Sequence, residues 1–179
     1  MNQLQQKYNK EVLPELKKKF GFKNDMAVPG IEKVIVNTGI GKYSSDQAAL
    51  DSIIADLAVI TGQKPAFTLA KKAVSGFKVR EGMKVGLKTT LRGERMYDFI
   101  IRLNSMTLPR SRDFRGIDQK SIDQNGNLNL GLKEQIVFPE ISHESVKIIF
   151  GLEITVKTSA KNKEKGMELL RLMGFPIKK

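Results

Sequence analysis

Hydrophobic residues recur along the chain with two different spacings, one typical of helices and one typical of strands. Near the N-terminus, apolar or aromatic side chains recur every four residues, at Leu4, Tyr8, Val12, Leu16 and Phe20. This spacing predicts an amphipathic helix. Pro14 falls inside it and is expected to kink the helix or to start a new helical segment.

A second helix is predicted between a polar turn and Gly62. Its apolar face carries Leu50, Ile53, Leu57 and Ile60. Three consecutive residues before it are candidates for the N-cap: Ser44, Ser45 and Asp46.

Two more helices are predicted further along the chain. One runs from about residue 94 to 106 with Met96, Phe99, Ile100 and Leu103 on one face, and Leu108-Pro109 is expected to end it. The other spans about residues 162 to 173. The stretch RSRDFRGIDQKSIDQNGN (110–127), which follows the first of these helices, is polar and is expected to be mostly loop.

Strict alternation of apolar and polar residues predicts strands. The sequence MKVGLKTTLR (83–92) places Met83, Val85, Leu87, Thr89 and Leu91 on one face and Lys84, Gly86, Lys88, Thr90 and Arg92 on the other. Segments 127–133 and 150–158 alternate in the same way. IEKVIVNT (31–38) and AFTLA (66–70) are also predicted strands.

These elements predict an α+β fold with a mostly antiparallel sheet that has helices on one face and polar side chains on the other. We expect a single domain over residues 1–179, with a projecting basic loop at about 70–83. The predicted polar face carries Lys33, Asn37, Lys84, Lys88, Thr90, Arg92, Asn129, Lys133, Thr155 and Lys157.

The net charge and its distribution indicate what kind of partner the protein binds. The formal net charge is +12, which favours a polyanionic partner. Between Lys71 and Arg115 there are twelve Lys or Arg residues and four Asp or Glu residues, so a quarter of the chain holds eight of the net positive charges. A generally solubilising surface would spread the charge more evenly.

The basic segment VSGFKVREG contains little that could pack into a core. Phe77 is its one aromatic residue and lies between Gly76 and Lys78. An exposed loop with Phe, Lys and Arg can stack on a base or ribose while pairing with phosphates. The alternative is a solvated hairpin loop without a ligand.

Several classes of function find no support in the sequence. The chain contains no cysteine and one histidine, His143, so the usual zinc patterns are excluded. We predict no catalytic residues, no metal and no cofactor. The sequence has no signal-peptide pattern and no apolar run long enough for a membrane helix, and we expect a cytoplasmic protein without a membrane partner.

The turn GIGKYS (39–44) matches half of a dinucleotide-binding fingerprint, with Ser44 where the third glycine would stand. The next predicted strand should end in an acidic residue that binds ribose. Here it ends in Ala70-Lys71-Lys72. A tight turn between a strand and a helix is the simpler interpretation.

Long stretches of the chain resemble one protein family, ribosomal protein five of the bacterial large subunit. The similarity is carried by LAVITGQKPAFTLAKKAVSGFKVREG (57–82), KTTLRGERMYDF (88–99), PRSRDFRGI (109–117), KEQIVFPEI (133–141) and SAKNKEKGMELLRLMGFPIKK (159–179). It runs in one register from the N-terminal helix to the C-terminus.

The resemblance implies a fold akin to an RNA-recognition module and a structural role in the ribosome. Family members bind 5S ribosomal RNA and help to anchor it in the central protuberance, among large-subunit ribosomal RNA and neighbouring ribosomal proteins. They also contact a small-subunit head protein across an intersubunit bridge, and a long loop reaches the peptidyl-site tRNA.

The resemblance also implies roles for particular residues. The RNA-recognition positions of the family match Asn37, Gln63 and Thr90; charge and predicted face add Lys64, Lys88 and Arg92. The expected tRNA contacts are Lys71, Lys72, Ser75, Gly76, Phe77, Lys78 and Arg80. The bridge candidates are Arg110, Arg112 and Arg115.

Two alternatives remain open from the sequence. One is a generic basic RNA-binding protein or chaperone without a fixed target. The other is a nucleotide-dependent enzyme that uses the GIGKYS turn.

Overall fold

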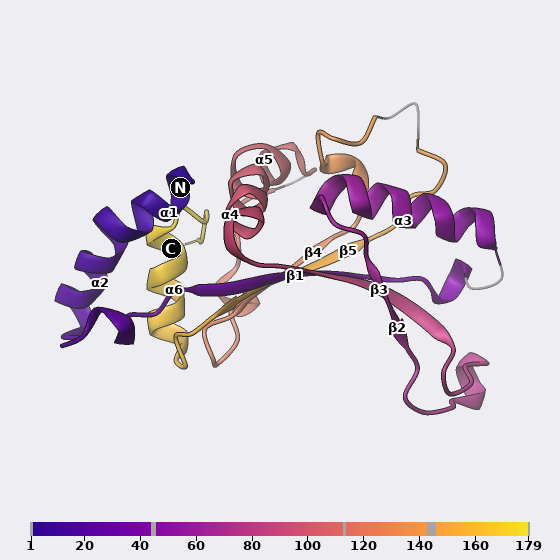
Figure 1. Ribbon diagram of the computed structural model, residues 1–179, viewed down its shortest axis with the longest axis horizontal. Helices are drawn as coiled ribbons and strands as arrows, with labels where there is room; N and C mark the ends of the chain where they lie inside the picture. The colour runs from indigo at the N-terminus through magenta and orange to yellow at the C-terminus, as the bar shows by residue number, and fades with distance from the viewer. Residues whose placement is uncertain (1, 44–45, 113, 143–145, 179) are drawn as a thin grey trace. The chain divides into compact units, whose positions relative to one another are not determined.

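The computed structural model describes residues 2–43, 46–112, 114–142 and 146–178 (Figure 1). The chain divides into two compact units. Unit 1 comprises residues 1–34, 91–130 and 155–179, and unit 2 comprises residues 35–90 and 131–154. The predicted single domain stays a prediction.

The described strands form a five-stranded antiparallel sheet in the order β2-β3-β1-β5-β4. Their bounds are β1 Ile31–Gly39, β2 Ala66–Leu69, β3 Lys84–Leu91, β4 Leu128–Leu132 and β5 Leu152–Thr158. All five strands coincide with predicted strand segments, within two residues at each end. The predicted α+β class is therefore confirmed.

Burial follows the predicted alternation along most of the sheet. Val34 and Val36 of β1 are fully buried, whereas Asn37 between Val36 and Thr38 is half-buried. Along β5, Leu152, Ile154 and Val156 are buried. The side chains that alternate with these apolar residues therefore lie on the opposite, polar face of each strand.

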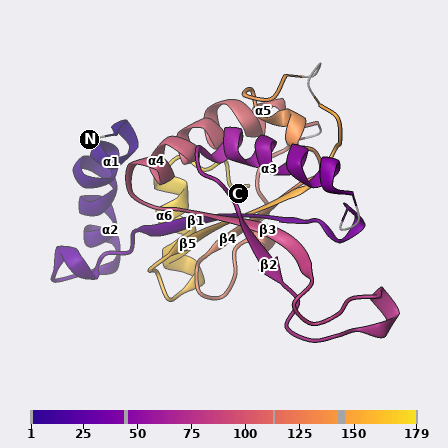
Figure 2. The ribbon, with the colours of Figure 1, turned by 45° about the vertical axis from the view of Figure 1, so that its right-hand side comes forward.

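Helix α3, Gln47–Thr61, belongs to unit 2 and runs along one side of the strands there (Figures 1 and 2). Its N-cap is Asp46, whose carboxylate accepts a hydrogen bond of 3.1 Å from Ala49 N. Gly62 ends the helix in the left-handed conformation (φ +67°), which glycine adopts without steric penalty. The other two cap candidates, Ser44 and Ser45, lie outside the described residues.

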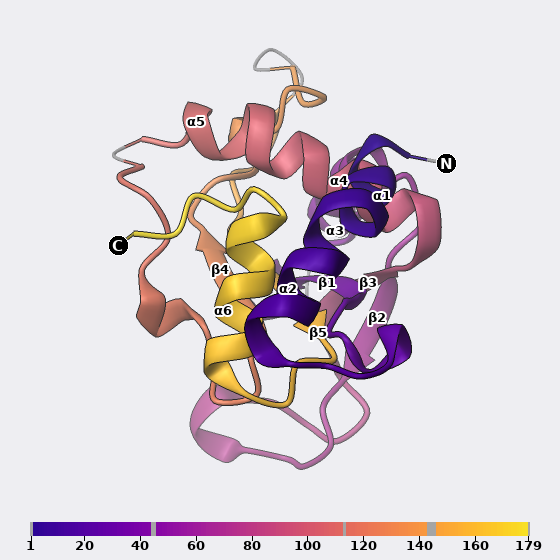
Figure 3. The same cartoon turned by 90° about the vertical axis from the view of Figure 1, so that its left-hand side faces the viewer.

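The helices of unit 1 come from both ends of the chain and from its middle. They are α1 (Gln3–Lys7), α2 (Leu13–Phe20), α4 (Gly93–Arg102), α5 (Leu108–Arg110) and α6 (Lys163–Leu172). Figure 3 shows α2 beside α6, and an ion pair of 2.7 Å joins Lys19 to Glu168 there.

Two helical stretches contain a proline and neither ends at it. Leu108-Pro109 was expected to end the helix predicted at about 94–106. Instead α4 continues through a π-helical turn, Leu103–Thr107, into α5, which ends at Arg110, one residue after Pro109. The N–H of Leu108 closes that wide turn onto Leu103 O. Pro109 then occupies the start of a new α-helical segment, where the missing N–H of proline is tolerated.

The N-terminal helix also contains a π-helical turn just before its proline. A π-helical turn, Tyr8–Val12, separates α1 from α2, and Leu13 N donates to Tyr8 O. Pro14 follows at the start of α2. Of the kink or new start expected at Pro14, the structure shows a new α-helical segment, which begins at Leu13.

Among the described residues, no helix is long and apolar enough to cross a membrane.

Candidate nucleic-acid interface

Strand β3 is the centre of the candidate site in unit 2, because β2 and β1 flank it. On one side, Lys88 lies opposite Ala66 of β2, and Leu87 lies opposite Phe67. On the other side, Ile40 N donates a 3.0 Å hydrogen bond to Val85 O.

The bond from Ile40 to Val85 indicates how β1 and β3 are aligned. Counting along antiparallel strands from this bond sets Asn37 opposite Lys88, and the buried Thr38 opposite the buried Leu87. Directly opposite residues have Cβ atoms about 5 Å apart. We infer that Asn37 and Lys88 are neighbours on the polar face.

Five of the predicted ribosomal RNA-binding residues belong to unit 2. Lys88 is exposed and Thr90, two residues along β3, is half-buried on the same face. Gln63 and Lys64 are exposed between the end of α3 and the start of β2. We call this set the recognition face: Asn37, Gln63, Lys64, Lys88 and Thr90.

The backbone at Gln63 is held by the end of α3. The hydroxyl of Thr61 lies 2.7 Å from Leu57 O and 2.9 Å from Gln63 O. Its single proton can be shared between these two carbonyls. The residue after Gly62 is thereby tied to the last turn of the helix while its side chain remains exposed.

The sixth predicted residue, Arg92, belongs to unit 1. It is exposed and is the N-cap residue of α4, with an extended backbone. The three bridge candidates, Arg110, Arg112 and Arg115, are also exposed residues of unit 1.

Lys84 departs from the expected alternation. The β2–β3 register is Thr68 opposite Gly86 but Leu69 opposite Lys84, so β3 contains one extra residue at this point. Such a bulge interrupts the two-residue period of side-chain direction. The ammonium group of Lys84 lies over the Phe67 ring, 4.3 Å from its centroid. Lys84 is therefore not in line with Lys88.

Residues 70–83, which we call the basic connection, join β2 to β3. In Figure 2 the connection continues beyond the ends of these two strands; its reach as a long projecting loop stays a prediction. Every predicted tRNA-contact residue in it is exposed: Lys71, Lys72, Ser75, Gly76, Phe77, Lys78 and Arg80. Phe77 retains 80% of its accessible surface.

The basic connection nevertheless has a defined backbone. Val74 and Val79 pair as an isolated antiparallel bridge, with hydrogen bonds of 2.9 and 3.2 Å. The turn between them is a 3-10 helix, Ser75–Phe77, that ends at Lys78 with φ +52°. A left-handed conformation is uncommon for lysine and indicates a tight turn. Phe77 is thus presented at the tip of a small hairpin.

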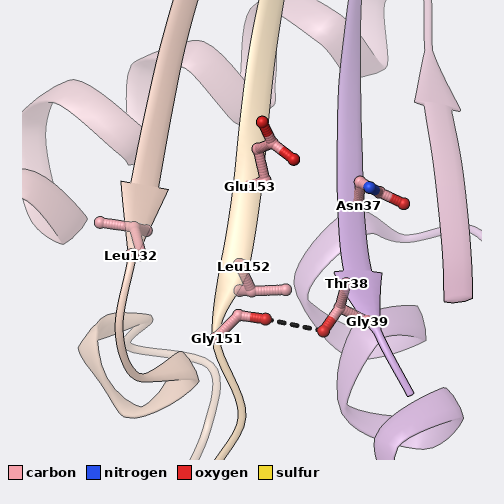
Figure 4. A pocket seen from close by; sticks show the side chains of 7 residues that line it. All are labelled: Asn37, Thr38, Gly39, Leu132, Gly151, Leu152 and Glu153. Carbon is pink, nitrogen blue, oxygen red and sulfur yellow. Dashed lines mark hydrogen bonds between the residues drawn. The ribbon is translucent and has the colours of Figure 1, made fainter. Parts of the chain in front are cut away.

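A shallow cleft lies beside Asn37, between β1 and β5 (Figure 4). Its lining residues are Asn37, Thr38, Gly39, Leu132, Gly151, Leu152 and Glu153. Glu153 is exposed and alternates with the buried Leu152 and Ile154, but it was not among the predicted site residues. Its position as an acid in the polar series Glu153, Thr155, Lys157 was the available signal.

The half-matched dinucleotide fingerprint forms a tight turn. Strand β1 ends at Gly39, Ile40 is fully buried, and a 3-10 turn, Gly41–Tyr43, follows. His143 and Ser44 lie outside the described residues. Within the described ranges, no group of three or more His, Cys, Asp or Glu side chains could hold a metal ion.

Two family models match most of the chain. The model of the C-terminus of the ribosomal protein L5 family matches residues 84–177, and the model of ribosomal protein L5 itself matches residues 24–80. A curated relative is large ribosomal subunit protein uL5 of Halothermothrix orenii, which is 52% identical over 177 residues, covering 99% of each chain. The expected resemblance is confirmed on both counts, and the chain belongs to the ribosomal protein L5 family.

Proposed function

We propose that this protein binds 5S ribosomal RNA through the recognition face and contacts tRNA through the basic connection. Its family makes the chain a structural constituent of the ribosome, in the cytoplasm, and not an enzyme. The proposal adds which RNA the protein holds and which residues hold it. The bridge to the small subunit through Arg110, Arg112 or Arg115 belongs to the same proposal.

The observation that carries the proposal is the placement of two short polar side chains beside a lysine. Asn37 and Thr90 are half-buried on adjacent strands, with the exposed Lys88 on the same face. A half-buried side chain on a strand has few available orientations, so its hydrogen-bonding groups are positioned before RNA binds. Phosphate contacts supply affinity and direction, whereas positioned polar groups distinguish one RNA site from another.

The support for a sheet as the platform comes from its buried side. Leu87 and Leu91 of β3 are fully buried behind the recognition face. Thr89, also buried, leaves the outward positions to Lys88 and Thr90. The apolar side thus fixes which β3 residues face a ligand.

The proposal is tested by filter-binding titration of 5S RNA with Asn37→Ala and Thr90→Ala variants. Each variant is expected to weaken binding by about 1–3 kcal/mol, the loss typical of one specific contact. Asn9→Ala, which removes an exposed amide from the N-terminal π-helical turn, is the matched control and should bind as the wild type does.

A second RNA of equal length and fold complexity, at the same salt concentration, separates the proposal from generic RNA binding. Wild-type protein should prefer 5S RNA, because non-specific binding depends mainly on phosphate charge. Equal affinity for both RNAs, or wild-type affinity in both alanine variants, would contradict the proposed site.

A further inference from the structure

The cleft beside Asn37 has the size and lining of a site for a single planar ring system. Its volume is about 230 Å³, below the ~300–1,000 Å³ of typical small-molecule pockets. One base turned out of an RNA strand would need no more room. All seven lining residues belong to unit 2.

A hydrogen bond joins two of the residues that line the cleft. The Thr38 hydroxyl donates a 2.7 Å hydrogen bond to Gly151 O, which joins β1 to the start of β5 (Figure 4). Gly39 contributes no side chain, and a Cβ there would meet no atom within 4 Å. Leu132 and Leu152 line the cleft but expose only 8% and 3% of their surface. The exposed backbone at Gly39 and Gly151 is therefore the part of the lining against which the face of an aromatic ring can lie.

The walls of the cleft carry the groups that could read the edge of a base. Asn37 comes from β1 and Glu153 from β5. Glu153 is exposed and makes no ion pair or hydrogen bond with any other residue that the structure describes. By contrast, the ammonium group of Lys157, on the same strand, lies 3.0 Å from Glu32.

A carboxylate at this position selects against phosphate and for hydrogen-bond donors. Phosphate oxygens would be repelled by Glu153, although the surrounding face is basic. An ionised carboxylate only accepts hydrogen bonds, and its two oxygens can accept two neighbouring donors. Among the bases, the Watson–Crick edge of guanine presents two neighbouring donors, N1–H and the 2-amino group, beside the O6 acceptor. The Asn37 amide can supply the donor that O6 needs.

We propose that this cleft binds one unpaired guanine of the RNA partner, with Glu153 accepting hydrogen bonds from N1–H and the 2-amino group and Asn37 donating to O6. The proposal rests on the proposed RNA-binding function and adds a specificity-determining residue to it. Single-stranded RNA is commonly read in this way, with an unstacked base recognised at its edge.

Inosine interference tests the proposal, because inosine is guanosine without the 2-amino group. 5S RNA carrying randomly placed inosine is selected for binding, and the positions where inosine excludes the RNA from the bound fraction are mapped. The proteins compared are the wild type, Glu153→Gln, Glu153→Ala and the control Asp51→Asn. Asp51 is an exposed carboxylate of α3 that accepts a hydrogen bond from Gln47, so its substitution removes the same charge away from the cleft.

With the wild type and Asp51→Asn, inosine at one unpaired position should weaken binding about fivefold or more, as expected for losing part of a two-point base contact. With both Glu153 variants that interference should fall below about twofold, even where removal of the negative charge raises total affinity. An unchanged inosine pattern in the Glu153 variants would overturn the proposal. So would the absence of any sensitive unpaired position in the wild type.

The guanine site and the proposed function can be contradicted separately. If Asn37→Ala weakens 5S RNA binding while the inosine pattern ignores Glu153, the guanine site is wrong and the proposed function stands. If Asn37→Ala and Thr90→Ala both bind as the wild type does, the proposed function itself is wrong.

Discussion

The recognition face and the basic connection both carry cations, but they differ in what holds their side chains in place. On the recognition face, Asn37 and Thr90 are half-buried, and fully buried residues such as Val36 and Leu87 lie behind them. In the basic connection, every predicted contact residue is exposed, and backbone hydrogen bonds close the hairpin at Val74–Val79 and at Ala70–Met83. The cations thus lie on a strand backed by buried side chains in one region and on an exposed connection in the other.

The comparison of the two regions indicates that the cationic charge and the groups that give specificity need not lie in the same segment. Positioned polar groups on a sheet lose little freedom when they bind, which favours a lasting and selective contact. Exposed Lys and Arg side chains with one aromatic ring lose more freedom, and they suit a partner that binds and leaves. We therefore expect the recognition face to hold the resident RNA and the basic connection to touch a transient one.

The largest difference is expected in the free energy of unfolding, when a residue buried behind the recognition face and a residue at the tip of the basic connection are each replaced by alanine. Leu87→Ala should lower the free energy of unfolding by about 2–5 kcal/mol, because Leu87 is fully buried. Phe77→Ala should change it by less than about 0.5 kcal/mol, because Phe77 is 80% exposed. Denaturant unfolding of both variants measures the contrast, and comparable losses would show that the tip is packed as the sheet is.

A smaller effect is expected on the salt dependence of RNA affinity, which distinguishes the charged Lys88 from the uncharged Asn37 on the recognition face. Lys88→Ala should lower the slope of log affinity against log salt by about 1 and weaken binding of different RNAs alike. Asn37→Ala should weaken 5S RNA binding with the slope unchanged, because its amide carries no charge. Titrations at several salt concentrations, with Lys10→Ala as an exposed control, measure the slopes. A change of slope in Asn37→Ala would undo the distinction.

The sequence predicted the elements well because one physical pattern governs most of them. Strands with one buried and one polar face must alternate, so the outward placement of Asn37, Lys88 and Thr90 followed from Val36, Leu87 and Leu91. The C-terminus of α3 at Gly62 was equally predictable, since glycine favours the left-handed conformation found there.

What the sequence did not predict depends on contacts between distant segments. The extra residue in β3 becomes visible only when β2 is paired with it, and the pairing brings Lys84 over Phe67. Leu108-Pro109 was expected to end the helix, because no neighbouring residue in the sequence indicates the π-helical turn that precedes Pro109. The cleft at Glu153 is lined by residues from distant segments, among them Thr38 and Gly151, which are 113 positions apart and hydrogen-bonded to each other.

The separation of two RNA-binding regions is tested most directly by a crossed titration. Asn37→Ala/Thr90→Ala and Lys78→Glu/Arg80→Glu are each titrated with 5S RNA, and large subunits assembled with each variant are probed for protection of tRNA. We expect the first pair of substitutions to weaken 5S RNA binding, whereas the second should leave it nearly intact and reduce the protection of tRNA. Equal loss of 5S RNA binding in both variants would contradict the account, because the basic connection would then be part of the primary RNA site.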